Sequence, residues 1–209
     1  MDVQINYDYR GDDLKDMPLV ELAQFVLDHQ EKPQNTEVSL SFVTDEEIAR
    51  LNEQYRGKEG PTDVLSFECD GVEDELSDMV PAGFGDVYEL GDVVIAPDVA
   101  ERQTHEFGTT FEQEVSLLFV HGLLHLCGYD HIVEEDAKVM EALEDEILAA
   151  WTARERPWAV HPLTTSRSYA PLKRRDKGSA TSLHPPSPMP GAGFSKRFAA
   201  NEIYASTHA

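Results

Sequence analysis

The sequence predicts an α+β fold in which a small, mixed four-stranded sheet packs with about five helices, one of them a central helix. Residues 3–9 and 37–43 alternate between apolar and polar side chains, as half-buried strands do. Capping boxes at 44–47 and 110–113 each begin a segment whose apolar residues have helical spacing. The second of these helices is strongly apolar, so we expect it to be buried beside the sheet.

The remaining elements are predicted in order from local signals. Pro18 suits the first turn of an amphipathic helix. Residues 63–68 and 91–96 are predicted to form the third and fourth strands, and Pro97 begins a short helix that Gly108 ends. A last amphipathic helix is predicted from a stripe of apolar residues: Met140, Leu143, Ile147 and Trp151.

Composition divides the chain near residue 156. Residues 1–156 are predicted to be one domain, whereas 157–209 is rich in Pro and Ser, lacks periodicity and is predicted to be a disordered, basic tail. The cluster Lys173-Arg174-Arg175 in this tail is either simply solvated or a weak contact for RNA or a ribosomal surface. Residues 69–89 form a long acidic loop, which we interpret as a solvated insertion rather than a lid.

The acidic charge of the protein limits what it can bind. Its formal net charge is −23. Residues 161–209 contain seven Lys/Arg and two acidic residues, or +5, so residues 1–160 contain 10 basic and 38 acidic residues, or −28. This charge argues against broad, non-specific affinity for nucleic acid, and any phosphate binding has to be local. Three of the ten basic residues lie close together in sequence: Arg50, Arg56 and Lys58.

We expect a soluble, cytoplasmic protein without a membrane partner. No apolar run is long enough to span a membrane, and the N-terminus has no basic-then-apolar leader. The two cysteines, Cys69 and Cys127, fit a reducing compartment. Cys127 comes two residues after His125 and points to another helix face, so we interpret it as a core residue rather than a metal ligand.

The most informative segment is His121-Gly-Leu-Leu-His125-Leu-Cys-Gly128-Tyr-Asp-His131. Histidines four residues apart lie on one face of a helix. Gly128 can adopt the left-handed conformation that ends a helix, which lets His131 return toward the first two histidines. Three imidazoles and one open position describe a catalytic zinc site better than a structural one. We therefore predict a zincin-like three-histidine metal site on the central helix, in which His121, His125 and His131 bind one zinc ion per chain.

The spacing matches the metzincin pattern H-E-x-x-H-x-x-G-x-x-H at every ligand and at the glycine. Gly122 replaces the glutamate that acts as general base, which counts against a metalloprotease, the enzyme alternative. Gly122 makes room either for close helix packing or for a substrate, and both explanations stay open. A second alternative is a non-catalytic assembly factor with a structural zinc, in which Asp130 would serve as a fourth ligand.

Two segments together resemble the YbeY family of bacterial endoribonucleases and rRNA maturation factors. One is the histidine motif, and the other is residues 51–67, with Tyr55-Arg56 and Pro61-Thr62-Asp63, followed by Leu90-Gly91-Asp92. The resemblance covers roughly residues 1–155. It implies a single-strand-specific, metal-dependent endoribonuclease that acts in small-subunit rRNA 3′-end processing and in ribosome quality control. The implied partners are RNA and either small-subunit ribosomal proteins or an assembly GTPase.

The resemblance also implies roles for individual residues. It assigns a metal, usually zinc, to the three motif histidines, and a required catalytic function to Arg56. Glu59-Gly60 departs mildly from the family, in which an aspartate and a variable residue are more usual. We expect Arg56 to hold a phosphate rather than to form a structural ion pair, because its guanidinium is planar and basic residues are scarce here.

The general base stays open at this stage. Proton transfer can come from a metal hydroxide, from the RNA 2′-hydroxyl or from a carboxylate, and Asp63 and Asp92 are the carboxylate candidates. For both residues we favour a role in orienting a ligand histidine or in ending a strand over direct proton transfer.

Overall fold

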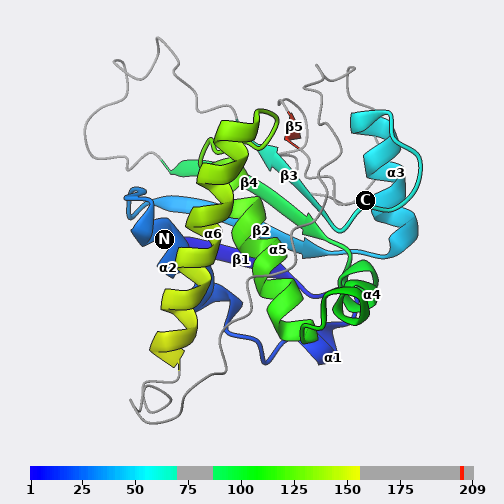
Figure 1. The fold of residues 1–209 in the computed structure, drawn as a ribbon, viewed down its shortest axis with the longest axis horizontal. Helices are drawn as coiled ribbons and strands as arrows, with labels where there is room; N and C mark the ends of the chain where they lie inside the picture. Colours follow the sequence, from blue (N-terminus) through cyan, green and yellow to red (C-terminus); the bar gives the residue numbers. More distant parts are fainter. Residues whose placement is uncertain (70–86, 156–202, 205–209) are drawn as a thin grey trace.

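The computed structural model describes residues 1–69, 87–155 and 203–204 (Figure 1). These residues form an α+β structure, which confirms the predicted fold class. In chain order the elements are β1 (Asp2–Asn6), α1 (Gly11–Leu14), α2 (Leu19–His29), β2 (Thr36–Phe42), α3 (Asp45–Arg56), β3 (Val64–Glu68), β4 (Tyr88–Ile95), α4 (Pro97–Phe107), α5 (Phe111–Leu126), α6 (Glu134–Glu155) and β5 (Ile203–Tyr204).

The sheet is mixed, with the strand order β1-β2-β4-β3-β5. Strands β1, β2 and β4 run parallel, and β3 runs antiparallel to β4. These are the four expected strands. The two-residue β5 pairs with β3 and comes from the segment 157–209. The rest of that segment lies outside the described residues, as does 70–86 of the acidic loop.

Local signals explain where the helices begin. The Thr44 hydroxyl accepts the N–H of Glu47 at 3.3 Å and so caps α3. Both arms of the second predicted capping box are present at the start of α5, because the N–H of Gln113 bonds the Thr110 hydroxyl while the Gln113 side chain bonds the N–H of Thr110. The capping box fixes the residue at which α5 begins, and therefore which face of the helix carries His121 and His125.

Two elements differ from expectation for identifiable reasons. Strand β4 begins three residues before the predicted residue 91, because its pairing with β2 contains a bulge: Glu37 pairs with Glu89 and Val38 with Gly91. The extra residue breaks the simple alternation from which a strand is predicted. The helix α1 was not expected, since it has only four residues and a single buried one, Leu14.

The sheet separates two apolar layers, and Figure 1 shows α5 and α6 in front of the sheet. Strand β3 alternates between them: Val64 belongs to the main core with α5, whereas Leu65 and Phe67 pack with α3 on the opposite face. The ring of Phe67 meets that of Tyr55 edge-on, with 5.3 Å between centroids. Helices α2, α5 and α6 therefore share one face of the sheet, and α3 covers the other.

Helix α5 is the central element of the main layer. It contacts β3 and β4 as well as α2, α4 and α6. Its residues from Val115 to Leu126 are buried with the exception of Ser116, as expected for a helix with apolar residues on nearly every side. The side chains of His121 and His125 therefore lie in the protein interior rather than in solvent.

Close packing explains the glycine at position 122. A Cβ on Gly122 would lie 2.7 Å from Cγ1 of Val93 and 3.2 Å from the Ser66 hydroxyl oxygen. The Ser66 hydroxyl also donates to the Gly122 carbonyl at 3.2 Å. Of the two explanations that the sequence allows, the structure supports tight packing of α5 on the sheet.

We expect Gly122→Ala to destabilise the protein. The added methyl overpacks a buried site, at a cost of about 1–3 kcal/mol, and the better helix propensity of alanine offsets about 1 kcal/mol of it. The free energy of unfolding in urea should fall by roughly 1 kcal/mol. Ser116→Ala on the same helix is the control, because it improves propensity at a half-buried position. A Gly122→Ala protein as stable as the Ser116→Ala protein would contradict the packing explanation.

Candidate metal centre

The end of α5 brings the third histidine of the motif back to the first two. His121 and His125 lie one turn apart on α5 and are 3% and 1% exposed. After the helix, Gly128 has a φ of 93°, and its N–H donates to the carbonyl of His125 at 2.8 Å. The chain reverses there, and His131, 5% exposed, lies against the other two. The predicted helix end at Gly128 and the return of His131 are therefore both present.

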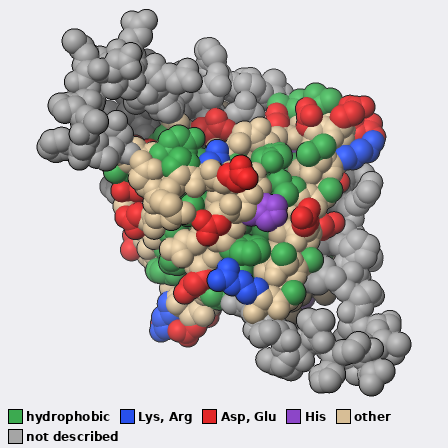
Figure 2. Space-filling model, turned by 90° about the vertical axis from the view of Figure 1, so that its left-hand side faces the viewer, with side chains coloured by type: hydrophobic (Ala, Val, Ile, Leu, Met, Phe, Trp, Pro, Cys, Tyr) green, Lys and Arg blue, Asp and Glu red, His purple; other side chains and the backbone are tan. Residues whose placement is uncertain are grey.

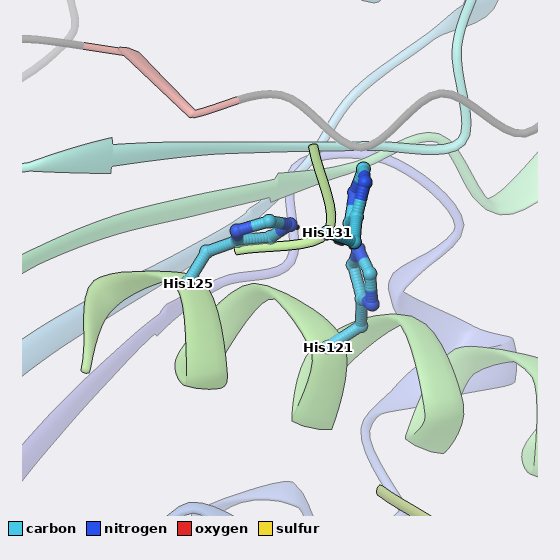
Figure 3. Close-up of side chains that lie close together, drawn as sticks. All are labelled: His121, His125 and His131. Atoms are coloured by element: carbon cyan, nitrogen blue, oxygen red, sulfur yellow. Dashed lines mark hydrogen bonds between the residues drawn. The ribbon is translucent and has the colours of Figure 1, made fainter. Parts of the chain in front are cut away.

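The three imidazole rings converge on one point (Figure 3). The ring centroids of His121 and His125 are 4.6 Å apart, those of His125 and His131 are 5.0 Å apart, and those of His121 and His131 are 5.4 Å apart. One nitrogen from each ring lies within 4.8 Å of the other two. Nitrogen atoms this close, on buried side chains, can hold a metal ion.

Hydrogen bonds determine which ring nitrogens face this point. Nδ1 of His125 donates to the backbone carbonyl of Tyr129 at 2.9 Å, and Nδ1 of His121 donates to the carboxylate of Glu144. A carbonyl oxygen can only accept a hydrogen bond, and so can an ionised carboxylate, so we assign the hydrogen to both Nδ1 atoms and a lone pair to both Nε2 atoms. The two Nε2 atoms are 3.0 Å apart. Two lone pairs face each other stably only around a cation or a proton, so this donor set fits a metal such as zinc.

Two other residues of the motif, Asp130 and Cys127, are not part of the histidine cluster. The carboxylate of Asp130 accepts the backbone N–H of His131 at 2.6 Å, and Asp130 is absent from the metal-ligand cluster of the described residues. Burial raises the pKa of the Cys127 thiol to about 11, so the thiol is protonated near neutral pH. This agrees with the interpretation of Cys127 as a core residue.

Arg56 comes from another part of the molecule, at the C-terminal end of α3. Its Nη1 donates to the side-chain oxygen of Asn52 at 3.3 Å, and the Asn52 amide in turn donates to the carbonyl of Gly60. Burial lowers the pKa of Arg56, and the negative charge of Asp63 opposes this shift. Burial also lowers the pKa of Lys58, and the positive charge of Arg56 adds to the effect. Two half-buried cations therefore lie close enough to repel each other.

The two carboxylate candidates have structural contacts. Asp63 accepts the N–H of Val64 and the side-chain amide of Gln103, both at 2.9 Å, at the start of β3. Asp92 accepts the hydroxyl of Ser39 on the neighbouring strand. These contacts agree with the preference for structural roles over direct proton transfer.

Sequence reasoning missed the two acceptors that orient the histidines. The Tyr129 carbonyl leaves no trace in a sequence, because any residue has one. Glu144 did leave a signal: it comes four residues after Met140 and three before Ile147, so an acid lies on the predicted apolar stripe of the last helix. A charged residue within such a stripe indicates an interior partner.

The surface agrees with the acidic composition. On the face drawn in Figure 2, acidic side chains occur at many points and basic side chains at few.

Within the described residues, no helix has both the length and the apolar character that crossing a membrane requires.

Comparisons with known proteins match the chain over most of its described length. A family model described as Endoribonuclease YbeY matches residues 4–152. The endoribonuclease YbeY of a Nocardioides species is 45% identical over 136 residues, which cover 65% of this chain and 89% of that protein. The endoribonuclease YbeY of a Thermoanaerobacter species is 41% identical over 153 residues, which cover 70% of this chain and 96% of that protein. The solution structure of the Thermotoga maritima protein TM1509 covers 78% of this chain and 99% of its own, at 27% identity and a TM-score of 0.45.

The matched range contains α5, the turn at Gly128 and all three histidines of the converging cluster. It also contains Arg56 and Asn52, which contacts it. The chain belongs to the YbeY endoribonuclease family.

Proposed function

We propose that this protein is a zinc-dependent endoribonuclease that cuts single-stranded RNA. In this proposal His121, His125 and His131 hold one zinc ion, and Arg56 binds the phosphate at the cut. Residues 1–156 carry the activity, and the substrate is ribosomal RNA, notably at the 3′ end of the small-subunit rRNA, in the cytoplasm. The observation that carries the proposal is the buried cluster of three imidazoles in a chain of an endoribonuclease family.

The chemistry follows from the donor set. A zinc ion in such a site supplies Lewis acidity to a water molecule and to a phosphoryl oxygen. The protein presents the Nε2 lone pairs of His121 and His125 in a fixed direction, because hydrogen bonds hold their Nδ1 atoms. The rings are almost fully buried, which excludes bulk water and strengthens electrostatic interactions at the site.

Arg56 supplies a planar cation for the phosphate. A guanidinium stays charged near neutral pH even when burial lowers its pKa, and its paired N–H groups match two phosphate oxygens. Its contact with Asn52 restrains the side chain. An anion placed between Arg56 and Lys58 would relieve their mutual repulsion, which supports a phosphate as the partner of this pair.

The acidic surface bears on how RNA reaches the site. Residues 1–160 carry a formal charge of −28, so long-range attraction does not steer the protein toward RNA. Partners that bind both the protein and the RNA would compensate, and we propose small-subunit ribosomal proteins or an assembly GTPase in this role. Because these partners belong to the ribosome or to its assembly, we also propose that the protein acts in ribosome quality control.

A peptidase is not proposed. The metzincin general base would occupy position 122, where this chain has a glycine packed against Val93 of the sheet. Neither the residue nor the space for a carboxylate is present at that position.

The metal is tested by elemental mass spectrometry together with cleavage of a labelled single-stranded RNA. We expect one zinc per chain and cleavage in the native protein, and loss of both in His121→Ala, because two histidines bind zinc much more weakly than three. His105→Ala, an exposed histidine on α4, is the control and should keep both. Zinc bound without any cleavage by the native protein would instead support an assembly factor, and a native protein without metal would refute the proposal.

Replacing Arg56 should separate cleavage from metal binding. We expect Arg56→Ala to keep its zinc and to cleave RNA about 100- to 1,000-fold more slowly, the usual loss when one donor to a transition-state oxygen is removed. Arg50→Ala is the matched control, since Arg50 is exposed on the same helix and pairs with Glu47. If Arg56→Ala kept both zinc and full cleavage rate, the phosphate role of Arg56 would be wrong.

A further inference from the structure

Glu144 lies on the face of α6 that packs into the core. Its side chain is only 12% exposed. The residues one turn before and after it on the same face, Met140, Ile147 and Leu148, are 0%, 0% and 4% exposed. An apolar side chain would ordinarily fill this position, because burial of a carboxylate costs free energy unless the charge is compensated.

The carboxylate of Glu144 has a specific partner. One of its oxygens accepts the Nδ1–H of His121, on the neighbouring helix α5. A hydrogen bond to a buried carboxylate is stronger than one to a neutral acceptor, so it offsets part of the cost of burial. The contact links the last described helix to the first histidine of the motif, 23 positions earlier in the sequence.

This contact has three consequences for His121. It holds the hydrogen on Nδ1, so Nε2 keeps the lone pair that faces His125. It prevents the ring from turning, because the carboxylate comes from a helix that is itself anchored in the core. Finally, a negative acceptor makes the imidazole a stronger electron donor. His125 differs, because its Nδ1 donates to a neutral backbone carbonyl.

We propose that Glu144 is a positioning residue for the metal: it fixes the tautomer and orientation of His121 and strengthens the bond of His121 to the ion. This inference rests on the proposed function, in which the three histidines hold zinc. It adds a residue from outside the histidine motif, and it assigns α6 a role in metal binding in addition to packing.

The zinc affinity of the full-length protein, measured by competition with a chromophoric chelator, tests this role. We expect Glu144→Ala to bind zinc about 10- to 100-fold more weakly, as is usual for loss of an outer partner of a ligand histidine. Glu144→Gln should weaken binding about tenfold, because its amide oxygen still accepts the Nδ1–H but carries no charge. Glu146→Gln makes the same chemical change on an exposed part of the helix, where the carboxylate lies 3.8 Å from His29, and should bind zinc like the native protein.

A second measurement distinguishes positioning from a merely structural role. Nitrogen-15 NMR of the imidazoles in the metal-free, full-length protein should show a hydrogen on Nδ1 of His121 in the native protein and in Glu146→Gln, in addition to any proton held between the two Nε2 atoms. In Glu144→Ala, a mixture of the two tautomers is expected, since no carboxylate selects one. A structural role alone would change the melting temperature and leave the tautomer as it is.

The outcomes separate this inference from the function on which it rests. If the native protein binds zinc, and Glu144→Ala and Glu144→Gln bind it as tightly as the native protein does, the role of Glu144 is overturned and the proposed function stays intact. Native protein that binds no zinc would overturn the proposed function itself. If Glu144→Ala does not fold, Glu144→Gln decides, and unchanged zinc affinity in that variant overturns the inference.

Discussion

The close contact of α5 with the sheet at Gly122 is the constraint on which the rest of the structure depends. A helix that approaches β3 and β4 this closely and is covered by α2, α4 and α6 has no solvent-facing side at its centre. Each polar group on it needs a partner inside the protein. Ser66 provides one for the Gly122 carbonyl, and Glu144 and the Tyr129 carbonyl provide them for His121 and His125. The turn after α5 and the position of α6 therefore support the histidine cluster directly.

Charge is arranged unevenly around this core. The protein is acidic, yet two half-buried cations, Arg56 and Lys58, lie close together at the end of α3, where burial and the positive charge of Arg56 lower the pKa of Lys58. In the main core, the carboxylate of Glu144 lies against His121 of the buried histidine cluster. A protein with this distribution gains little from long-range attraction to RNA, so in the proposed function recognition depends on short-range contacts at a few residues and on the proposed partners.

Most of the fold was predictable because its signals are local. Alternation, capping residues and the glycine at 128 locate the strands, the helices and the end of α5 within a few residues. The strand order and the bulge in β4 were not predictable, since they depend on pairing between segments distant in the sequence. The histidine cluster was predictable from spacing on one helix and one turn. Its partner Glu144 was not identified, because the contact joins two helices, although its place on an apolar stripe was visible. Whether Gly122 serves packing or substrate needed the position of Val93.

The central claim is that one metal ion binds to His121, His125 and His131 through nitrogen atoms whose direction is set by hydrogen bonds on the opposite side of each ring. Diffraction from crystals of the zinc-loaded protein, recorded at the zinc absorption edge, tests this most directly, because it locates zinc atoms independently of any model of the protein. The account predicts one anomalous peak per chain within about 2.1 Å of all three histidines, bonded to Nε2 of His121 and His125. A peak elsewhere, or bonding through Nδ1 of either histidine, would contradict it.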